Sequence, residues 1–120
     1  MSIRRKRDDE AVVRRFATAC GNRSSAALRL LLAPEAVVIS DGGGKVAAAL
    51  TPVRGADAAA RCVTDLLPDA AVTVEAVNGQ AGVVLRRAGA VVAVVSLSVA
   101  GAKVAAVWIV LNPDKLRHWV

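Results

Sequence analysis

Few side chains in this 120-residue sequence are of the types that perform acid-base or nucleophilic chemistry. His118 is the only histidine, and it lies on the C-terminal tail, away from any serine or cysteine that it could activate. Glu75 lies in an alternating strand pattern, which favours a structural or rim carboxylate over a general base. The sequence contains no tyrosine. We therefore expect no catalytic residues and a non-catalytic protein.

The two cysteines do not have the spacing of a metal or redox site. Cys20 and Cys62 are far apart in the sequence, and neither belongs to a Cys-x-x-Cys pair. Both fall in apolar stretches expected to be helical, where a free cysteine packs as a small hydrophobic residue. Free thiols suit a reducing compartment, so we expect a cytoplasmic protein with no metal and no cofactor.

A glycine-rich segment, Asp41-Gly42-Gly43-Gly44-Lys45, resembles a phosphate-binding loop only superficially. The Walker spacing is absent, and a strand rather than a helix is expected to follow, so a helix N-terminus to bind an anion is missing. Two glycines would suffice for a turn, and each additional glycine costs roughly 0.5–1 kcal/mol in ordering entropy. Three glycines predict that another chain segment approaches this turn closely.

The net charge of +6 is concentrated at the two ends of the chain. Residues 1–23 carry +4 and residues 103–120 carry +2, while the part between them is neutral. A nucleic-acid-binding domain usually has its basic stripe on the folded surface, so this distribution favours a solvated tail over nucleic-acid contact. We expect residues 1–8 to form a basic flexible segment and residues 9–120 to form a single domain. Contact of residues 4–7 with phosphate or an acidic protein surface is the alternative.

The only charged residue between Ala88 and Pro113 is Lys103, so this stretch is long enough to span a bilayer, which takes about 20 apolar residues. Its valine-rich halves on either side of Gly101 favour a β-hairpin over a membrane helix. The basic start of the chain is not followed by an apolar run, so no secretory signal peptide is predicted. We expect no membrane association.

Capping residues and helix breakers bound three helices in the N-terminal half. The helices are predicted to run from Asp8 or Asp9 to Gly21, from Ser24 or Ser25 to Pro34, and from Gly55 to Leu67. Short strands are predicted at residues 37–39 and 45–50, between the second and third helices.

After Pro68 the apolar pattern changes to a period of two, which is typical of strands. Strands are predicted at residues 72–77, 82–86, 91–99 and 104–110, with turns at Asn78-Gly79, Ala88-Gly89 and Ala100-Gly101. Helices followed by such a meander predict an α+β fold, in which the three helices pack on one face of a curved, mostly antiparallel sheet.

The last two predicted strands are apolar on both faces, because alanine, valine and isoleucine fill almost every position of residues 91–95 and 104–109. Three short helices cannot cover both faces of a long bent sheet. The pattern therefore predicts that a protein partner, either a second copy or a neighbouring domain, covers the second face.

Four short motifs together resemble the SnoaL-like C-terminal extension of extracytoplasmic-function RNA polymerase sigma factors. They are SDGGGK at residues 40–45, PVRGAD at 52–57, VNGQAG at 77–82 and NPDKLRH at 112–118. The resemblance extends from about Asp9 to the end of the sequence, and it implies the cone-shaped fold of the nuclear transport factor two-like superfamily. Ala81 stands where the family pattern leads us to expect proline.

The resemblance implies a regulatory domain that contacts sigma factor core domains or RNA polymerase and thereby modulates transcription. It implies no promoter binding by this chain, because sigma regions are missing from the sequence. The implied protein-contact loop is Asp41, Gly42, Gly43, Gly44 and Lys45, and the implied C-terminal motif is Asn112, Pro113, Asp114, Lys115 and Leu116. Both a free-standing protein and an extension excised from a longer sigma factor fit this sequence.

An alternative function is a small-molecule-binding protein, or a SnoaL-like cyclase or isomerase, that holds a small apolar ligand in the pocket of the cone. Such a site needs a polar group at the pocket floor, and an alanine and valine lining offers few. A self-associating scaffold is a third interpretation, and we expect the isolated chain to form a homodimer through its sheet face.

Overall fold

The computed structural model describes residues 3–42, 51–117 and 119. Within these ranges the chain forms four helices and six strands. Their bounds, in chain order, are α1 (Ile3–Gly21), α2 (Ser25–Leu31), β1 (Leu32–Asp41), β2 (Val53–Arg54), α3 (Ala56–Leu66), β3 (Ala71–Val77), β4 (Gln80–Arg87), β5 (Ala90–Ala100), β6 (Lys103–Val110) and α4 (Pro113–Leu116).

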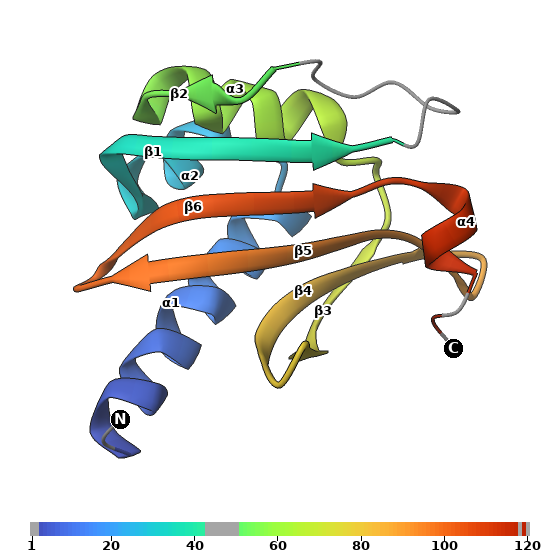
Figure 1. The fold of residues 1–120 in the computed structure, drawn as a ribbon, viewed down its shortest axis with the longest axis horizontal. Coiled ribbons are helices and arrows are strands. Elements are labelled where there is room, and N and C mark those ends of the chain that lie inside the picture. The colour runs from blue at the N-terminus through green and yellow to red at the C-terminus, as the bar shows by residue number, and fades with distance from the viewer. Residues whose placement is uncertain (1–2, 43–50, 118, 120) are drawn as a thin grey trace.

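The described strands form one curved sheet in the order β2-β1-β6-β5-β4-β3 (Figure 1). Strands β3 to β6 are an antiparallel meander, as the sequence predicts. Strand β6 then pairs in parallel with β1, which comes much earlier in the chain. The predicted α+β class and the mostly antiparallel sheet are therefore confirmed.

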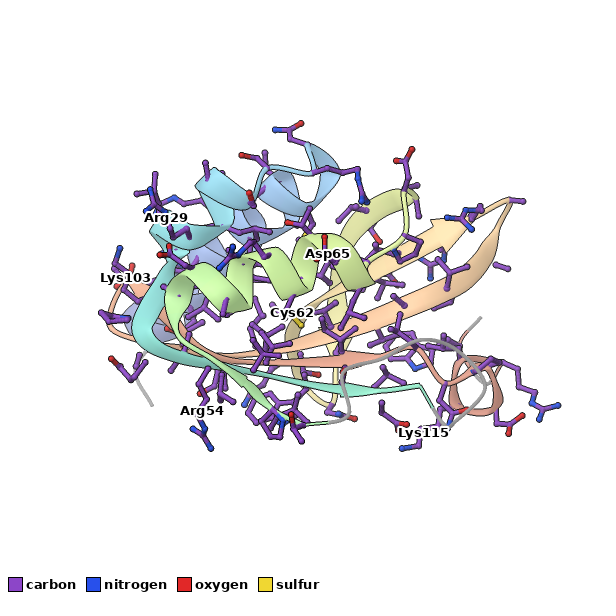
Figure 2. The ribbon with its side chains drawn as sticks, turned by 90° about the horizontal axis from the view of Figure 1, so that it is seen from above. Arg29, Arg54, Cys62, Asp65, Lys103 and Lys115 are labelled. Atoms are coloured by element: carbon purple, nitrogen blue, oxygen red, sulfur yellow. The ribbon has the colours of Figure 1, made fainter. Side chains whose placement is uncertain are left out.

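Helices α1, α2 and α3 lie on the same side of the sheet, which we call the inner face (Figures 1 and 2). The main hydrophobic core lies between these helices and the inner face, and Phe16 of α1 is fully buried in it. Its partners are small: Ala59 and Val63 of α3 and Val38 and Val107 of the sheet have no exposed surface. A core with one phenylalanine is thus built mainly from alanine and valine, as the composition requires.

Helix α1 begins at Ile3, five residues before the predicted cap at Asp8. The segment predicted to be flexible is therefore helical from residue 3 onward. Arginine and lysine are good helix formers, so the basic residues extend the helix rather than end it. The first turns of α1 project past the edge of the sheet (Figure 1).

Strand β1 is longer than the predicted residues 37–39, because it begins at Leu32, immediately after α2. Its register with β6 shifts between Leu32 and Val37, and Pro34 lies in this irregular part. Proline has no N–H to donate to a ladder, so a bulge is where a strand tolerates it. The predicted strand at residues 45–50 lies outside the described residues, and the short strand β2 at Val53 was missed.

Two tight turns of the meander lie where the sequence predicts them, and both have a left-handed backbone. Asn78 and Gly79 have φ values of 52° and 80°, and Ala88 and Gly89 have values of 53° and 82°. Two consecutive positive φ angles are typical of the two-residue hairpin turns that match the twist of a sheet.

The opposite side of the sheet, which we call the outer face, is only partly apolar. A small cluster of Val77, Val84 and Val94 is covered by Leu116 of α4, with Trp119 packed against it. Further along, Ile39 and Trp108 are paired neighbours on β1 and β6, with 39% and 41% of their surfaces exposed. The chain's own C-terminal segment thus covers one part of this face, and coverage of the rest by a protein partner stays a prediction.

Candidate protein-contact site

The start of the predicted protein-contact loop and the predicted C-terminal motif meet at one end of the sheet. Strand β1 ends at Asp41, which pairs with Val110 at the end of β6, and the backbone N–H of Leu111 donates to the carbonyl oxygen of Asp41 at 2.7 Å. Helix α4 follows directly. Lys115 of α4 donates from Nζ to Oδ2 of Asp41 at 2.6 Å. We call Asp41, Gly42 and α4 the loop–α4 site.

The sequence Asn112-Pro113 makes α4 begin where it does. Asn112 is the N-cap, and its Oδ1 accepts a hydrogen bond from the backbone N–H of Asp114 at 3.0 Å. Pro113 occupies the first helical position, where no N–H is required and its fixed φ suits the helix. The sequence predicted a turn here, and the structure extends this turn into one short helix.

Leu116 anchors α4 to the sheet. Its side chain is buried among Val77, Val84 and Val94 of the outer face. On the solvent side, Arg117 donates to Asp114 at 2.5 Å. With Leu116 fixed on the sheet, Lys115 lies beside Asp41, and Figure 2 shows Lys115 at the α4 end of the molecule, opposite Arg29 and Lys103.

The structure thus brings together Asp41 and Lys115, and it gives Asn112, Pro113, Asp114 and Leu116 roles in building and holding α4. Gly42 is buried at the end of β1. Gly43, Gly44 and Lys45, which belong to the predicted contact loop, lie outside the described residues.

A mostly apolar cavity of about 650 Å³ adjoins α4 at this end of the cone. Its lining includes Leu66, Pro68, Val91, Leu111, Leu116 and Trp119, and Arg117 lies at its margin. This cavity was not predicted from the sequence. The residue that could have indicated it is Trp119, a large aromatic side chain close to Leu116 of the C-terminal motif.

Glu75 is held in its ionised form on the outer face. It accepts hydrogen bonds from Arg86, which is paired with both of its oxygens, and from the Thr73 hydroxyl at 2.6 Å. These hydrogen bonds, first of all the one from Arg86, lower the pKa of Glu75 to about 2. A carboxylate with so low a pKa is a poor general base near neutral pH, which supports the prediction of a structural carboxylate.

The described residues include no cluster of three histidine, cysteine, aspartate or glutamate side chains that could hold a metal ion. Both cysteines are free, and burial raises the pKa of the Cys20 thiol to about 12. Among the described helices, none is long and apolar enough to cross a membrane.

No protein-family model matches this sequence, and a search of curated proteins also found no match. Solved structures do match. The SigJ extracytoplasmic function sigma factor of Mycobacterium tuberculosis superposes with a TM-score of 0.70 at 28% identity, over 90% of this chain and 43% of SigJ. This chain therefore spans less than half the length of that sigma factor.

Two further structures show the range of proteins that share the fold. An NTF-2 like protein of unknown function from Burkholderia xenovorans has a TM-score of 0.65 at 12% identity, over 97% of this chain and 95% of its own. An LEH-like epoxide hydrolase of M. tuberculosis has a TM-score of 0.62 at 12% identity, over 95% and 90%. The chain therefore has the nuclear transport factor two-like fold, which is found in both enzymes and a sigma factor. The likeness to SigJ agrees with the resemblance seen in the sequence motifs.

Proposed function

We propose that this chain is a non-catalytic regulatory domain of the sigma-factor type, which modulates transcription in the cytoplasm through contact with sigma factor core domains or RNA polymerase. The observation that carries the proposal is the Asp41–Lys115 ion pair, which joins the predicted protein-contact loop to the C-terminal motif of the sigma-factor resemblance. The similarity to SigJ over 90% of the chain supports the same class of function.

The geometry of the loop–α4 site suits a protein contact. The side chains of Asp41 and Lys115 are 37% and 63% exposed, so both charges lie within reach of a partner. An exposed ion pair contributes about 0–1 kcal/mol to stability, so a partner's charged groups can replace it at little cost. The capped and anchored α4 presents the lysine on a fixed backbone, which reduces the entropy lost on binding.

A direct binding measurement tests this proposal. A sigma factor core that lacks its own extension, taken from SigJ, is immobilised, and this chain is passed over it. We expect Asp41→Asn and Lys115→Met each to weaken binding by about fivefold or more, since each removes one charge from a contact. The matched control is Asp57→Asn, which removes an exposed ion pair with Arg29 elsewhere on the molecule.

If Asp41→Asn and Asp57→Asn both bind the sigma factor core as tightly as the unchanged chain does, the assignment of the loop–α4 site is refuted. A charge swap, Asp41→Lys with Lys115→Asp, separates the two roles of the pair. The swapped residues still attract each other, but a partner meets the opposite charge at each position. We therefore expect unchanged folding stability and weakened binding.

The apolar cavity beside α4 supports a second candidate function, the binding of a small apolar molecule. Its volume of about 650 Å³ lies in the range of ligand pockets, and Trp119 reports on its occupancy. Quenching of Trp119 emission by a naphthalene-type probe in a Trp108→Phe background, abolished by Leu66→Phe, is the result expected of a ligand pocket. Unchanged emission at saturating probe would exclude it.

A homodimer of the isolated chain belongs to the same proposal, with the exposed Ile39 and Trp108 of the outer face as the shared surface. Sedimentation equilibrium of the unchanged chain and of Trp108→Thr checks this point, and we expect the variant to shift toward the monomer.

A further inference from the structure

A second groove lies away from α4, where strand β5 continues beyond β4. The ladder between these two strands runs from Arg87 and Ala90 to Val83 and Val95 and stops there, although β5 extends to Ala100. The first residues of β4 pair with β3 alone. Figure 1 shows β5 and β6 running on together while β4 curves away toward the β3–β4 turn.

Beyond Val95, therefore, β5 has no ladder partner on its β4 side among the described residues. An unpaired strand edge presents backbone N–H and C=O groups in a row and accepts another extended chain. The part of β5 concerned is Leu97–Ala100, long enough to pair with a short segment.

The unpaired edge faces a groove of about 590 Å³ rather than open solvent. Gln80 and Ala81 of the β3–β4 hairpin form one wall, and Asp9, Glu10 and Val13 of α1 form another. Val13 and Leu97 supply buried apolar surface to the floor. The groove therefore has an apolar base, a backbone edge and an acidic rim.

Trp108 of β6 also lines this groove and is 41% exposed. Asp9 and Glu10 are half-buried. Within the part of the chain that the structure describes, neither carboxylate forms an ion pair with another side chain. Trp108 belongs to the outer face, whereas Asp9 and Glu10 come from α1 on the inner face. Alternate side chains of an extended segment point to opposite faces, so the groove is complementary to a segment that directs a cation to the carboxylates and an apolar side chain to Trp108.

We propose that this groove binds an extended peptide segment of a partner protein, which pairs with the free edge of β5, directs an arginine or lysine to the carboxylates of Asp9 and Glu10, and packs an alternate apolar side chain against Trp108. This groove is separate from the loop–α4 site, and it shares Trp108 with the surface proposed for the homodimer. Peptide binding in the groove goes beyond the proposed regulatory function and does not depend on it.

The test uses an acetylated and amidated Val-Arg-Val-Arg-Val peptide. It is titrated into the Trp119→Phe variant of the full chain, so that Trp108 is the only tryptophan, and amide resonances are followed in parallel. We expect saturable changes in Trp108 emission and in the amide signals of Leu97–Ala100, with slower hydrogen exchange at that edge. Val-Glu-Val-Glu-Val, and the arginine peptide N-methylated at its three central residues, should bind at least about fivefold more weakly.

The double variant Asp9→Asn with Glu10→Gln should bind the arginine peptide more weakly by a similar factor. Asp41→Asn should leave the affinity for this peptide unchanged. The two peptide controls act on the unaltered groove, so they keep the test decisive if the double variant folds poorly. Absence of a saturable change, equal binding of the glutamate peptide, or signals confined to α4 would overturn the proposal. Because Asp41→Asn tests the loop–α4 site alone, failure of one proposal is distinguishable from failure of the other.

Discussion

The Nζ atom of Lys115 lies 2.6 Å from Oδ2 of Asp41, although the two residues are 74 positions apart in the sequence. The backbone hydrogen bond from Leu111 to the Asp41 carbonyl lies beside this ion pair. The end of β1 and the start of α4 are thus held together by one main-chain and one side-chain contact, and a partner at this end of the sheet meets both segments as one surface.

The Asp41–Lys115 pair should contribute little to folding stability. We expect Asp41→Asn and Lys115→Met each to lower the free energy of unfolding by less than about 1 kcal/mol, because both side chains are exposed to water. The double variant should lose less than the sum of the two, since the residues interact directly. Urea unfolding of the four proteins measures this. A loss of 3 kcal/mol or more in either single variant, on the order of what a broken buried pair costs, would show that the pair cannot be exchanged for a partner.

The Glu75 carboxylate should make stability depend on pH in the acid range. Its pKa in the folded chain is about 2, against an ordinary value of 4.5. The stabilisation from ionised Glu75 is therefore complete above pH 4.5 and is lost as the pH falls through the folded pKa. We expect the difference in melting temperature between the unchanged chain and Glu75→Gln to shrink from pH 5 to pH 2.

Effects of pH on the rest of the chain are common to both proteins, so they cancel in that difference. An NMR titration of the Glu75 side chain gives an independent reading. A midpoint near 4.5, or a melting difference that is constant with pH, would contradict the role assigned to Arg86.

Gly82 is required where β4 passes close to its neighbours. A Cβ atom at this position would lie 2.6 Å from Cγ2 of Val77 and 2.8 Å from the carbonyl oxygen of Val95. We expect Gly82→Ala to destabilise the fold by about 1–3 kcal/mol, as overpacking does. The matched control is Gly21→Ala, where the nearest atom is 3.9 Å away and the change should stay within about 0.5 kcal/mol. Chemical denaturation compares them, and similar losses in both variants would argue against the close approach.

The two cysteines should differ in reactivity. Burial raises the pKa of Cys20 to about 12, so at pH 8 only about one thiol in ten thousand is ionised. The pKa of Cys62 is also raised, by burial and by the nearby negative charge of Asp65. We expect a maleimide at pH 8 to label Cys62 well before Cys20 in the folded chain and both at similar rates in denaturant. Mass spectrometry of timed samples detects the order, and faster labelling of Cys20 would contradict it.

The elements predicted correctly are those specified by residues close together in the sequence. Strand β3 is predicted by the alternation through Val72 and Val74, and its turn by the dipeptide Asn78-Gly79, all within ten residues. Ser24 caps α2 by accepting a hydrogen bond from the N–H of Ala27 at 3.1 Å. In each case the hydrogen bond or dihedral angle that defines the element is local, so composition and spacing are sufficient.

The elements that were missed are defined by distant contacts. Strand β2 is two residues long and exists only because Val53 and Arg54 pair with Val38 and Val37. Likewise, no pattern near Leu116 shows that it is buried on the outer face, because the valines that bury it come from β3, β4 and β5. The groove beside β5 depends on where β4 leaves its neighbour, and strand lengths predicted from sequence do not specify that offset.

The close approach predicted for the three glycines is only partly described by the structure. Helix α4 lies beside Asp41, at the start of that segment. Gly43 and Gly44 lie outside the described residues, so a contact with their backbone stays a prediction. The motif resemblance indicated that the two segments both matter, and the fold adds that they are spatial neighbours.

Strand β6 completes the sheet from the middle, because it lies between β1 and β5. During synthesis β1 is made well before β6, its parallel partner, so until then the edge of β1 on that side is unpaired. Closing this long loop is entropically costly and slow. The complete sheet therefore forms only after residues 103–110 have been made, and until then β1 has no parallel partner.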